Sequence, residues 1–245
     1  MIIDTHCHID LYPDPGEVLQ DSIKANTTVL AMTNLPSHFE MGYPHFKSLK
    51  KIRLALGMHP LMADSHKKEF DLFLNNISKT SYVGEVGLDF SAEGMPTKDI
   101  QIYTFAKILK VVSGQKKILS IHSRQAEKEV LELLVKYKIE NAIFHWYSGP
   151  LYLIEKIAHA GYYFSINPAM TRSASGRKII SKIPKALLLT ETDGPFVMEH
   201  NSPARPGQVS SVISCLARLL LRSNKEIEEL IEMNFNSVIK RLRPY

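Results

Sequence analysis

Short apolar segments alternate with longer segments of helical periodicity along nearly the whole chain. The apolar segments are almost continuously hydrophobic, which is typical of strands that lie in a parallel sheet with both faces covered. An alternation of this kind predicts an α/β fold in which helices cover a parallel sheet. Eight strands are predicted, at residues 2–4, 28–32, 54–56, 82–86, 118–121, 142–144, 162–165 and 186–189.

Apolar residues at helical spacing predict helices between and after these strands. Eight strand–helix units in 245 residues fit a (β/α)8 barrel of the TIM type, regular or distorted, which takes about 250 residues. A doubly wound open sheet is the alternative, although no GxGxxG pattern follows the first strand. The predicted helices are 17–25, 36–49 (the weakest pattern), 65–77, 98–112, 125–137, 151–160 and 175–181, with 208–221 and 225–239 closing the chain.

The composition is that of an ordinary globular chain, and no repeat or linker divides it, so we expect a single domain over residues 1–245. No apolar run is long enough to cross a membrane. The first strand begins almost at Met1, so we expect no targeting leader. Two cysteines, Cys7 and Cys215, fit reduced thiols and a cytoplasmic location better than a disulfide. A net charge of +5 permits an acidic partner without requiring one.

The first strand runs into His6, Cys7 and His8. Side chains alternate along an extended strand, so His6 and His8 are expected to point the same way and Cys7 the opposite way. Two converging imidazoles make half of a transition-metal site. Taken alone, however, such a pair is about as often two ordinary hydrogen-bonded histidines, so the rest of the chain has to decide.

Further polar residues follow other predicted strands. In a barrel, the carboxyl ends of the strands meet at one mouth, where active sites are built. Burying histidines and carboxylates together is costly without a compensating cation, so a metal centre is favoured over a hydrogen-bonded polar plug. The residues expected at this mouth are His6, His8, His59, Glu85, His122, His145 and Asp193; the other histidines, His38, His45, His66, His159 and His200, are expected at the surface.

Six motifs stand in one order: HxH at 6–8, GMHP at 57–60, GEVGLD at 84–89, IHSR at 121–124, FHWYSG at 144–149 and ETDGPF at 191–196. This order resembles the TatD family of metal-dependent hydrolases and nucleases. The resemblance implies two divalent metal ions, whether zinc, manganese or magnesium. It also implies the ligands, which are His6, His8 and Asp193 for one ion, His122 and His145 for the other, and Glu85 for both.

The same resemblance implies the catalytic roles. A carboxylate that bridges two cations holds them roughly 3.5–4 Å apart, where a water between them is activated. Glu85 and Asp193 are therefore the expected catalytic residues. Besides binding a metal, Asp193 has a second possible role as the base that accepts the water's proton. His59 is expected to contact a substrate phosphate or the water at the metals.

Phosphate binding also needs positively charged side chains that do not bind the metals. Arg124 follows His122 closely, and a guanidinium matches phosphate oxygens in a two-pronged fit. Arg172 and Arg205 follow the seventh and eighth predicted strands. A role as solvated loop residues is at least as plausible for these two as phosphate binding. Trp146 and Tyr147 fit stacking on a nucleobase, although packing beneath the loop is the commoner use of such rings.

The resemblance implies a DNase that hydrolyses phosphodiester bonds, with exonuclease action on single-stranded or frayed DNA ends and no membrane partner. Segments 10–15, 164–170 and 191–196 are also similar to QatD, the TatD-like component of bacterial Qat antiphage systems, which implies antiphage defence with other defence-system proteins. Two departures, at 91–94 and 201–203, alter loops that choose the substrate. Amide or ester hydrolysis of a small molecule or aminoacyl-tRNA remains open, and so does a metal-holding binding subunit of a larger complex.

Overall fold

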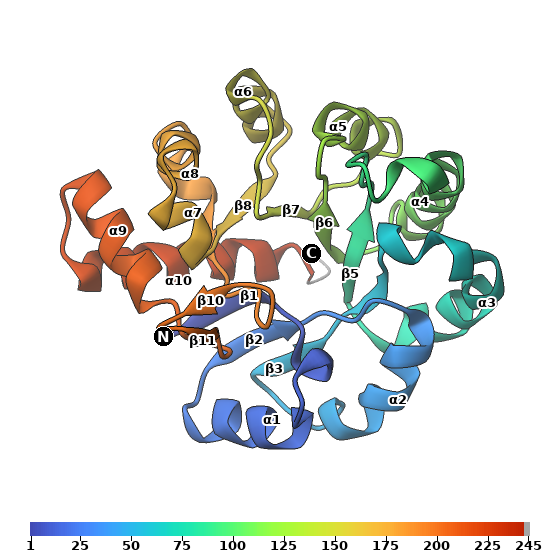
Figure 1. Ribbon diagram of the computed structural model, residues 1–245, viewed down its shortest axis with the longest axis horizontal. Helices are drawn as coiled ribbons and strands as arrows, with labels where there is room; N and C mark the ends of the chain where they lie inside the picture. The colour runs from blue at the N-terminus through green and yellow to red at the C-terminus, as the bar shows by residue number, and fades with distance from the viewer. Residues whose placement is uncertain (243–245) are drawn as a thin grey trace.

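In a computed structural model that describes residues 1–242, a ring of parallel strands is surrounded by helices (Figure 1). The strands form two parallel sheets, in the orders β1-β2-β3 and β4-β5-β6-β7-β8-β9. This confirms the predicted α/β fold; residues 243–245 of the predicted domain lie outside the described part. The strands are β1 (Ile3–Cys7), β2 (Thr28–Ala31), β3 (Ile52–Leu54), β4 (Leu56–Met58), β5 (Tyr82–Gly87), β6 (Ile118–His122), β7 (Ala142–His145), β8 (Tyr163–Ile166) and β9 (Leu188–Thr190), with a small hairpin of β10 (Met198–Glu199) and β11 (Ser202–Pro203).

Some of the helices begin at a residue whose side chain caps the first turn. The Asp14 side chain accepts the backbone N–H of Glu17 ahead of α1, and Ser223 and Glu226 form a reciprocal capping box on α10. Predicted helix 175–181 is observed, and a short helix that the sequence did not predict precedes it. The helices are α1 (Pro15–Lys24), α2 (Pro36–Phe46), α3 (His66–Asn76), α4 (Lys98–Val112), α5 (Glu127–Lys136), α6 (Leu151–His159), α7 (Pro168–Arg172), α8 (Ala174–Ile180), α9 (Ser210–Leu220) and α10 (Asn224–Lys240).

The strand ladder is interrupted at two places in the ring. At Ala55, between β3 and β4, the Thr33 hydroxyl donates to the Ala55 carbonyl at 2.8 Å and accepts the Gly57 N–H at 3.0 Å. Between β9 and β1 there is no ladder within residues 1–242. Instead the Thr5 hydroxyl donates to the Thr190 carbonyl at 3.0 Å, and the Asp193 N–H donates to the His6 carbonyl at 2.9 Å. The barrel is therefore of the distorted kind.

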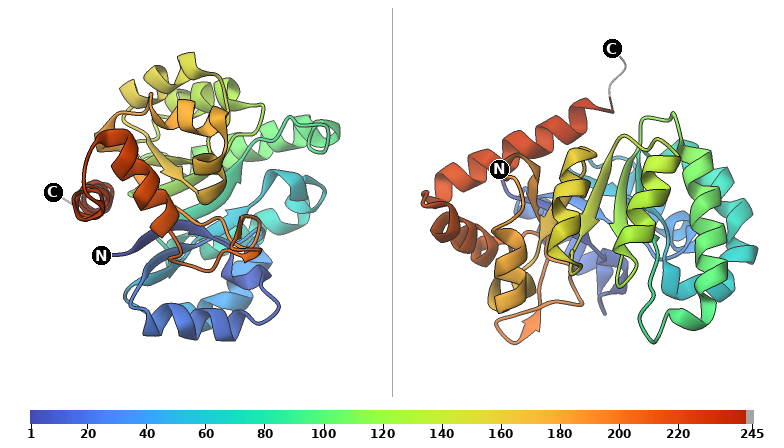
Figure 2. Two further views of the ribbon diagram at one scale, coloured as in Figure 1. Left: turned by 60° about the vertical axis from the view of Figure 1, so that its left-hand side comes forward. Right: turned by 90° about the horizontal axis from the view of Figure 1, so that it is seen from above.

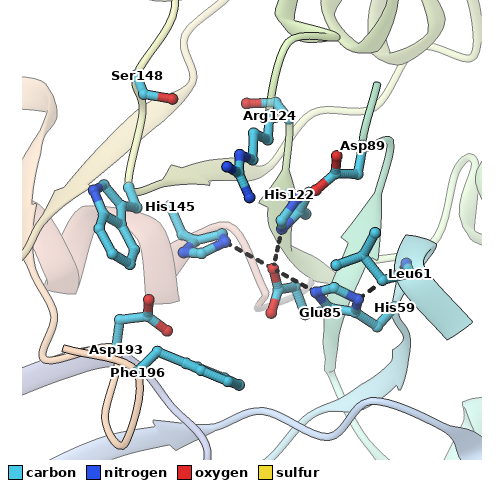
Figure 3. A pocket seen from close by; sticks show the side chains of 12 residues that line it. His59, Leu61, Glu85, Asp89, His122, Arg124, His145, Ser148, Asp193 and Phe196 are labelled. Carbon is cyan, nitrogen blue, oxygen red and sulfur yellow. Dashed lines mark hydrogen bonds and ion pairs between the residues drawn. The ribbon is translucent and has the colours of Figure 1, made fainter. Parts of the chain in front are cut away.

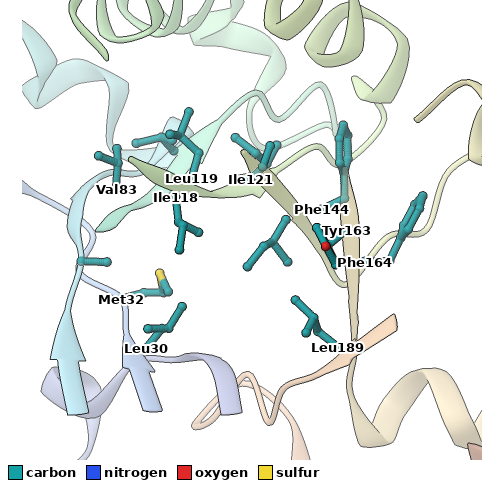
Figure 4. Packing of buried hydrophobic residues seen from close by; sticks show 14 of the residues in the cluster. Leu30, Met32, Val83, Ile118, Leu119, Ile121, Phe144, Tyr163, Phe164 and Leu189 are labelled. Atoms are coloured by element: carbon teal, nitrogen blue, oxygen red, sulfur yellow. The ribbon is translucent and has the colours of Figure 1, made fainter. Parts of the chain in front are cut away.

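The interior of the ring and the space beneath the helices are filled by one buried apolar cluster. Figure 4 shows part of it, where side chains from β2, β5, β6, β7 and β9 pack together, among them Leu30, Val83, Ile118, Phe144 and Leu189. Burying each large apolar side chain contributes about 1.5–3 kcal/mol, so this cluster holds the strands in place. A rigid ring of strands is what keeps the polar residues at its mouth in fixed positions.

Helix α10 lies across the opposite end of the strands (Figure 2, right). Asn234 donates to the carbonyl of Leu188 at 2.8 Å, where β9 begins, and Arg241 donates to Glu140 and Gly161, just before β7 and β8, at 3.1 Å each. The amino ends of these strands are therefore covered, and the carboxyl ends remain open for a site. None of the helices in residues 1–242 has the length and apolarity needed to cross a membrane.

Candidate metal centre

A cavity of about 450 Å³ opens at the carboxyl ends of the strands (Figure 3). This volume lies within the range of small-molecule binding sites. Five of the seven residues predicted for the mouth line the cavity, and the other two, His6 and His8, are fully buried beside it. The lining residues are His59, Leu61, Glu85, Asp89, His122, Ser123, Arg124, His145, Trp146, Ser148, Asp193 and Phe196.

The end of β1 places its two histidines as the alternation of strand side chains requires. The Nε2 atoms of His6 and His8 lie 3.2 Å apart, whereas the Cys7 thiol points to the Gly194 carbonyl at 3.4 Å. The Nδ1 atom of His6 is bonded to the Ser120 hydroxyl at 2.7 Å. Because that bond occupies Nδ1, His6 presents Nε2 to the centre of the site, and Cys7 takes no part in it.

Glu85 lies at the centre of the cluster, and its two oxygens face different groups of histidines. Oε1 lies 2.5 Å from Nδ1 of His122 and 2.8 Å from Nε2 of His145. Oε2 lies 3.1 Å from Nε2 of His8 and 3.4 Å from Nε2 of His6. A carboxylate placed between two sets of nitrogen donors in this way has the arrangement expected of a ligand shared by two cations.

Asp193 completes the group on the His6 side. Its Oδ1 lies 3.6 Å from Nε2 of His6 and 4.0 Å from Nε2 of His8. This oxygen is buried and has no hydrogen-bond partner among the described residues, and the same is true of Nδ1 of His8. An unpaired buried carboxylate oxygen is costly, and a cation held by His6, His8 and Asp193 would compensate for that cost at Asp193.

The chemistry of the donors therefore fits divalent metals. The ligand atoms of His6, His8 and Asp193 lie within 4.8 Å of one another, and so do those of His6, Glu85 and His145. A third such group consists of His59, Glu85 and His122. Imidazole nitrogens combined with carboxylate oxygens suit zinc or manganese, while magnesium favours oxygen donors.

The pKa values of the two carboxylates of the cluster are shifted in opposite directions. Burial raises the pKa of Glu85, but His59, His145 and the hydrogen bonds from His122 and His145 outweigh it and hold that pKa well below its usual range. Burial raises the pKa of Asp193 well above its usual range, with His145 as the main opposing influence. A cation near Asp193 would oppose this shift and favour the ionised carboxylate.

Asp89 is a partner of His122 that the sequence analysis did not single out. Its Oδ2 accepts a hydrogen bond from Nε2 of His122 at 2.8 Å, so the other ring nitrogen faces Glu85. The backbone makes this possible at Gly87, where φ is +147° and a Cβ atom would lie 1.9 Å from the His122 carbonyl. The signal was present in the GEVGLD motif, because Asp89 directly follows the strand that carries Glu85.

Glu191 is a second missed partner, located at the end of β9. Its Oε1 accepts the backbone N–H of Trp146 and the side-chain N–H of Asn167, each at 3.0 Å, and lies 3.9 Å from Nδ1 of His145. The hydroxyl of Ser165 donates to its other oxygen. Glu191 therefore fixes the segment that carries His145, and its position in the ETDGPF motif is the signal that would have found it.

His59 fits a hydrogen-bond donor better than a metal ligand. Its Nδ1 accepts the backbone N–H of Leu61 at 3.1 Å, so in the neutral ring the proton lies on Nε2, which points to Oε1 of Glu85 at 3.3 Å. Behind it lies His66, whose surface prediction is wrong: this ring is buried and pairs with the His59 carbonyl at 3.0 Å. His66 starts α3 directly beside the His59 segment, and that contact explains its burial.

The three arginines have different surroundings. Arg124 lines the cavity, and its guanidinium makes no hydrogen bond or ion pair within residues 1–242. Arg172 instead pairs with Glu199 at 2.6 Å, and Arg205 pairs with Asp21 at 2.6 Å. Arg124 alone among these three is therefore available to a ligand in the cavity.

The two aromatic residues of the FHWYSG motif also differ. Tyr147 is buried, and its hydroxyl donates to the Pro150 carbonyl at 2.7 Å, so it packs beneath the loop. Trp146 is only partly buried and lines the cavity.

Comparison with known proteins agrees with this geometry. A family model described as "TatD related DNase" matches residues 3–240. The human protein named Deoxyribonuclease TATDN3 is 27% identical, with 99% of this chain and 96% of that protein aligned. The uncharacterized metal-dependent hydrolase YjjV of Escherichia coli is 27% identical over 95% of each chain. The crystal structure of YjjV superposes with a TM-score of 0.86 at 26% identity, covering 97% of both chains. A TatD family hydrolase structure from Entamoeba histolytica, 16% identical, shares the fold with a TM-score of 0.81.

Proposed function

This chain belongs to the TatD family of metal-dependent hydrolases, and we propose that it is a deoxyribonuclease that hydrolyses phosphodiester bonds at DNA ends. One observation carries the proposal: Glu85 lies between two groups of histidines, with one oxygen toward each group. The name of the human relative, a deoxyribonuclease, supports DNA as the substrate. The lone guanidinium of Arg124 in the cavity supports phosphorus as the electrophile.

The metals would be held by the residues that converge on the cavity. His6, His8 and Asp193 would hold one ion, His122 and His145 the other, and Glu85 both. Bound divalent metals supply Lewis-acid polarisation of the phosphate and a water that is nucleophilic at neutral pH.

The protein's own residues carry the remaining steps. Asp193 lines the cavity, and its second carboxylate oxygen, the one not needed to hold the cation, would accept the proton of the attacking water. His59 and Arg124 line the cavity, where their side chains would lie beside the phosphate oxygens as negative charge develops. Water adds to phosphorus, the P–O bond to the leaving nucleotide breaks, and the leaving oxygen takes up a proton.

The shape of the site supports attack at ends. A concave cavity at a barrel mouth admits the end of a strand more readily than the middle of a duplex, so single-stranded or frayed ends are the expected substrates. The short segments similar to QatD support a role in antiphage defence, together with other defence-system proteins. Cys7 and Cys215 are buried free thiols, which fits action in the cytoplasm.

The test is a substrate panel with metal-reconstituted protein. Linear single-stranded DNA should be degraded much faster than covalently closed single-stranded DNA of the same sequence, with duplex DNA and RNA run beside them. Equal rates on the linear and closed strands would rule out end-dependent attack. Turnover of amide or ester substrates without any cleavage of nucleic acid would replace the proposal with a carbonyl hydrolase. No turnover of any substrate would favour a binding subunit.

A further inference from the structure

Two aromatic side chains line the cavity without belonging to the metal-binding cluster. Trp146 directly follows His145, and Phe196 lies three residues after Asp193. Phe196 is 58% exposed, although most large apolar side chains of the chain are buried. In Figure 3 Phe196 lies beside Asp193, on the other side of Glu85 from Arg124. An exposed ring at the edge of a polar cavity has apolar surface left for a ligand.

The backbone at Trp146 is held in a conformation that a bulky residue rarely adopts. Its φ is +38°, in the left-handed region. The N–H of Trp146 is bonded to Oε1 of Glu191 at 3.0 Å, and Glu191 is itself fixed by Asn167 and Ser165. Strain of this kind persists where surrounding contacts impose it, and it gathers at binding sites. Across this turn in the backbone, the side chain of Trp146 lines the cavity and that of its neighbour Tyr147 is buried.

The cavity thus offers two kinds of contact. Arg124 and His59 provide donors for an anionic phosphate, and Trp146 and Phe196 provide flat apolar faces. A phosphate ester without a ring would use only the first kind. A nucleotide would use both, because every base has a π-face that stacks on aromatic side chains whatever the sequence.

We propose that Trp146 and Phe196 bind the base of the terminal nucleotide by stacking, while its phosphate lies at the metal centre. This inference rests on the proposed function, since it identifies the part of the substrate that the two rings recognise. Phe196 has a second possible role, which is to cover a metal ligand. Its ring meets that of His8 edge-on, with the centroids 5.3 Å apart.

Trp146 is the only tryptophan in the chain, so intrinsic fluorescence reports directly on this cavity. Metal-loaded protein is titrated with thymidine 5′- and 3′-monophosphate and, in parallel, with 2-deoxyribose 5-phosphate, which has no base. We expect quenching by a nucleotide and little change with the sugar phosphate. Equal responses to the nucleotides and the sugar phosphate, or no response to either, would overturn the proposal. This readout needs no turnover, so it is independent of whether DNA is cleaved.

Variants of Phe196 separate stacking from cover of His8. Phe196→Leu keeps an apolar side chain over His8 but removes the flat ring, and Phe196→Tyr keeps the ring. We expect Phe196→Leu to bind the mononucleotide about 5- to 150-fold more weakly, with unchanged metal content, and Phe196→Tyr to resemble the wild type. Tyr152→Ala is the control, because it removes an equally exposed ring of α6 that does not line the cavity. Wild-type affinity in Phe196→Leu would overturn the proposal.

A kinetic comparison distinguishes failure of this inference from failure of the proposed function. Single-stranded oligonucleotides with ordinary or abasic terminal residues are compared in the wild type and in Phe196→Leu. We expect a lower KM for the ordinary ends in the wild type and no difference in the variant. Cleavage of both ends with the same KM in the wild type would refute stacking while the nuclease stands. Absence of cleavage, with fluorescence quenching intact, would refute the nuclease and leave the base site standing.

Discussion

Asp89 shows, at the scale of single residues, how the cluster depends on a side chain that touches no expected metal. Burial raises its pKa, but the hydrogen bonds with His122 and Ser91 lower it to about 2, so Asp89 stays ionised at neutral pH. Asp89→Asn removes the charge that orients the His122 ring. We expect a 10- to 100-fold loss of metal affinity, measured by calorimetric titration, with the exposed Asp99→Asn as control. An unchanged affinity would show that His122 needs no such partner.

Arg124 is the residue that we expect to act on the phosphate itself. Its guanidinium has no protein partner within residues 1–242, so Arg124→Ala should leave folding unchanged and remove a donor from the developing charge. A loss in kcat/KM of about 10²–10³ is expected for DNA cleavage, with partial recovery in Arg124→Lys. Arg172→Ala, which breaks a pair with Glu199 instead, should change the rate far less. Comparable losses in both variants would argue against a phosphate contact.

At this scale the sequence predicted the residues of the site better than their partners. The positions of His6 and His8 on one side of β1 follow from the period of a strand alone. The bond between Asp89 and His122 depends on how β5 and β6 align and on a close approach at Gly87, and neither is local. His66 was expected at the surface for the same reason. Its hydrogen bond with the His59 carbonyl cannot be predicted from the apolar periodicity of its helix.

At the scale of the elements, the junction of β9 with β1 depends on Asp4. Its carboxylate accepts the backbone N–H of Thr192 at 3.0 Å, the Thr192 hydroxyl at 2.6 Å and the N–H of Gly207 at 3.0 Å. Asp4→Ala would leave these donors unpaired, so we expect the free energy of unfolding to fall by about 2–4 kcal/mol in urea titrations of the metal-free protein. The exposed Asp71→Ala should have little effect. A loss below about 1 kcal/mol in Asp4→Ala would mean that the junction does not depend on this carboxylate.

The elements that were mispredicted share a cause. Residues 54–56 were expected to be one strand. Instead the Thr33 hydroxyl bonds to the Ala55 carbonyl and the Gly57 N–H, and the segment is divided into β3 and β4 at Ala55. The last strand was placed at 186–189, whereas β9 begins at Leu188, after a 3-10 turn at Lys185–Leu187. Asn234 of α10 donates to the carbonyls of Lys185 and Leu188, at either end of this turn. Apolar periodicity locates an element, but contacts from distant segments set its ends.

At the scale of the whole molecule, we expect metal binding to stabilise the fold. The ligands come from β1, β5, β6, β7 and the segment after β9, so a bound cation ties segments from both sheets together. At a free metal concentration of 100 times Kd, the free energy of unfolding rises by about 2.7 kcal/mol. For a chain of this size we expect Tm to rise by about 5–10 °C on adding zinc or manganese to chelator-treated protein, measured by calorimetry. An unchanged Tm would contradict a shared metal site in the native fold.

We propose that the cluster around Glu85 is a metal-dependent centre that cleaves DNA. The most direct test measures the initial rate on linear single-stranded DNA for chelator-treated and metal-reconstituted protein, in the wild type, in Glu85→Ala and in the exposed control Glu93→Ala. We expect no cleavage without metal, recovery in the wild type and Glu93→Ala, and a rate in Glu85→Ala roughly 100-fold or more lower. Near-normal cleavage by Glu85→Ala, or by the wild type in excess chelator, would contradict the account.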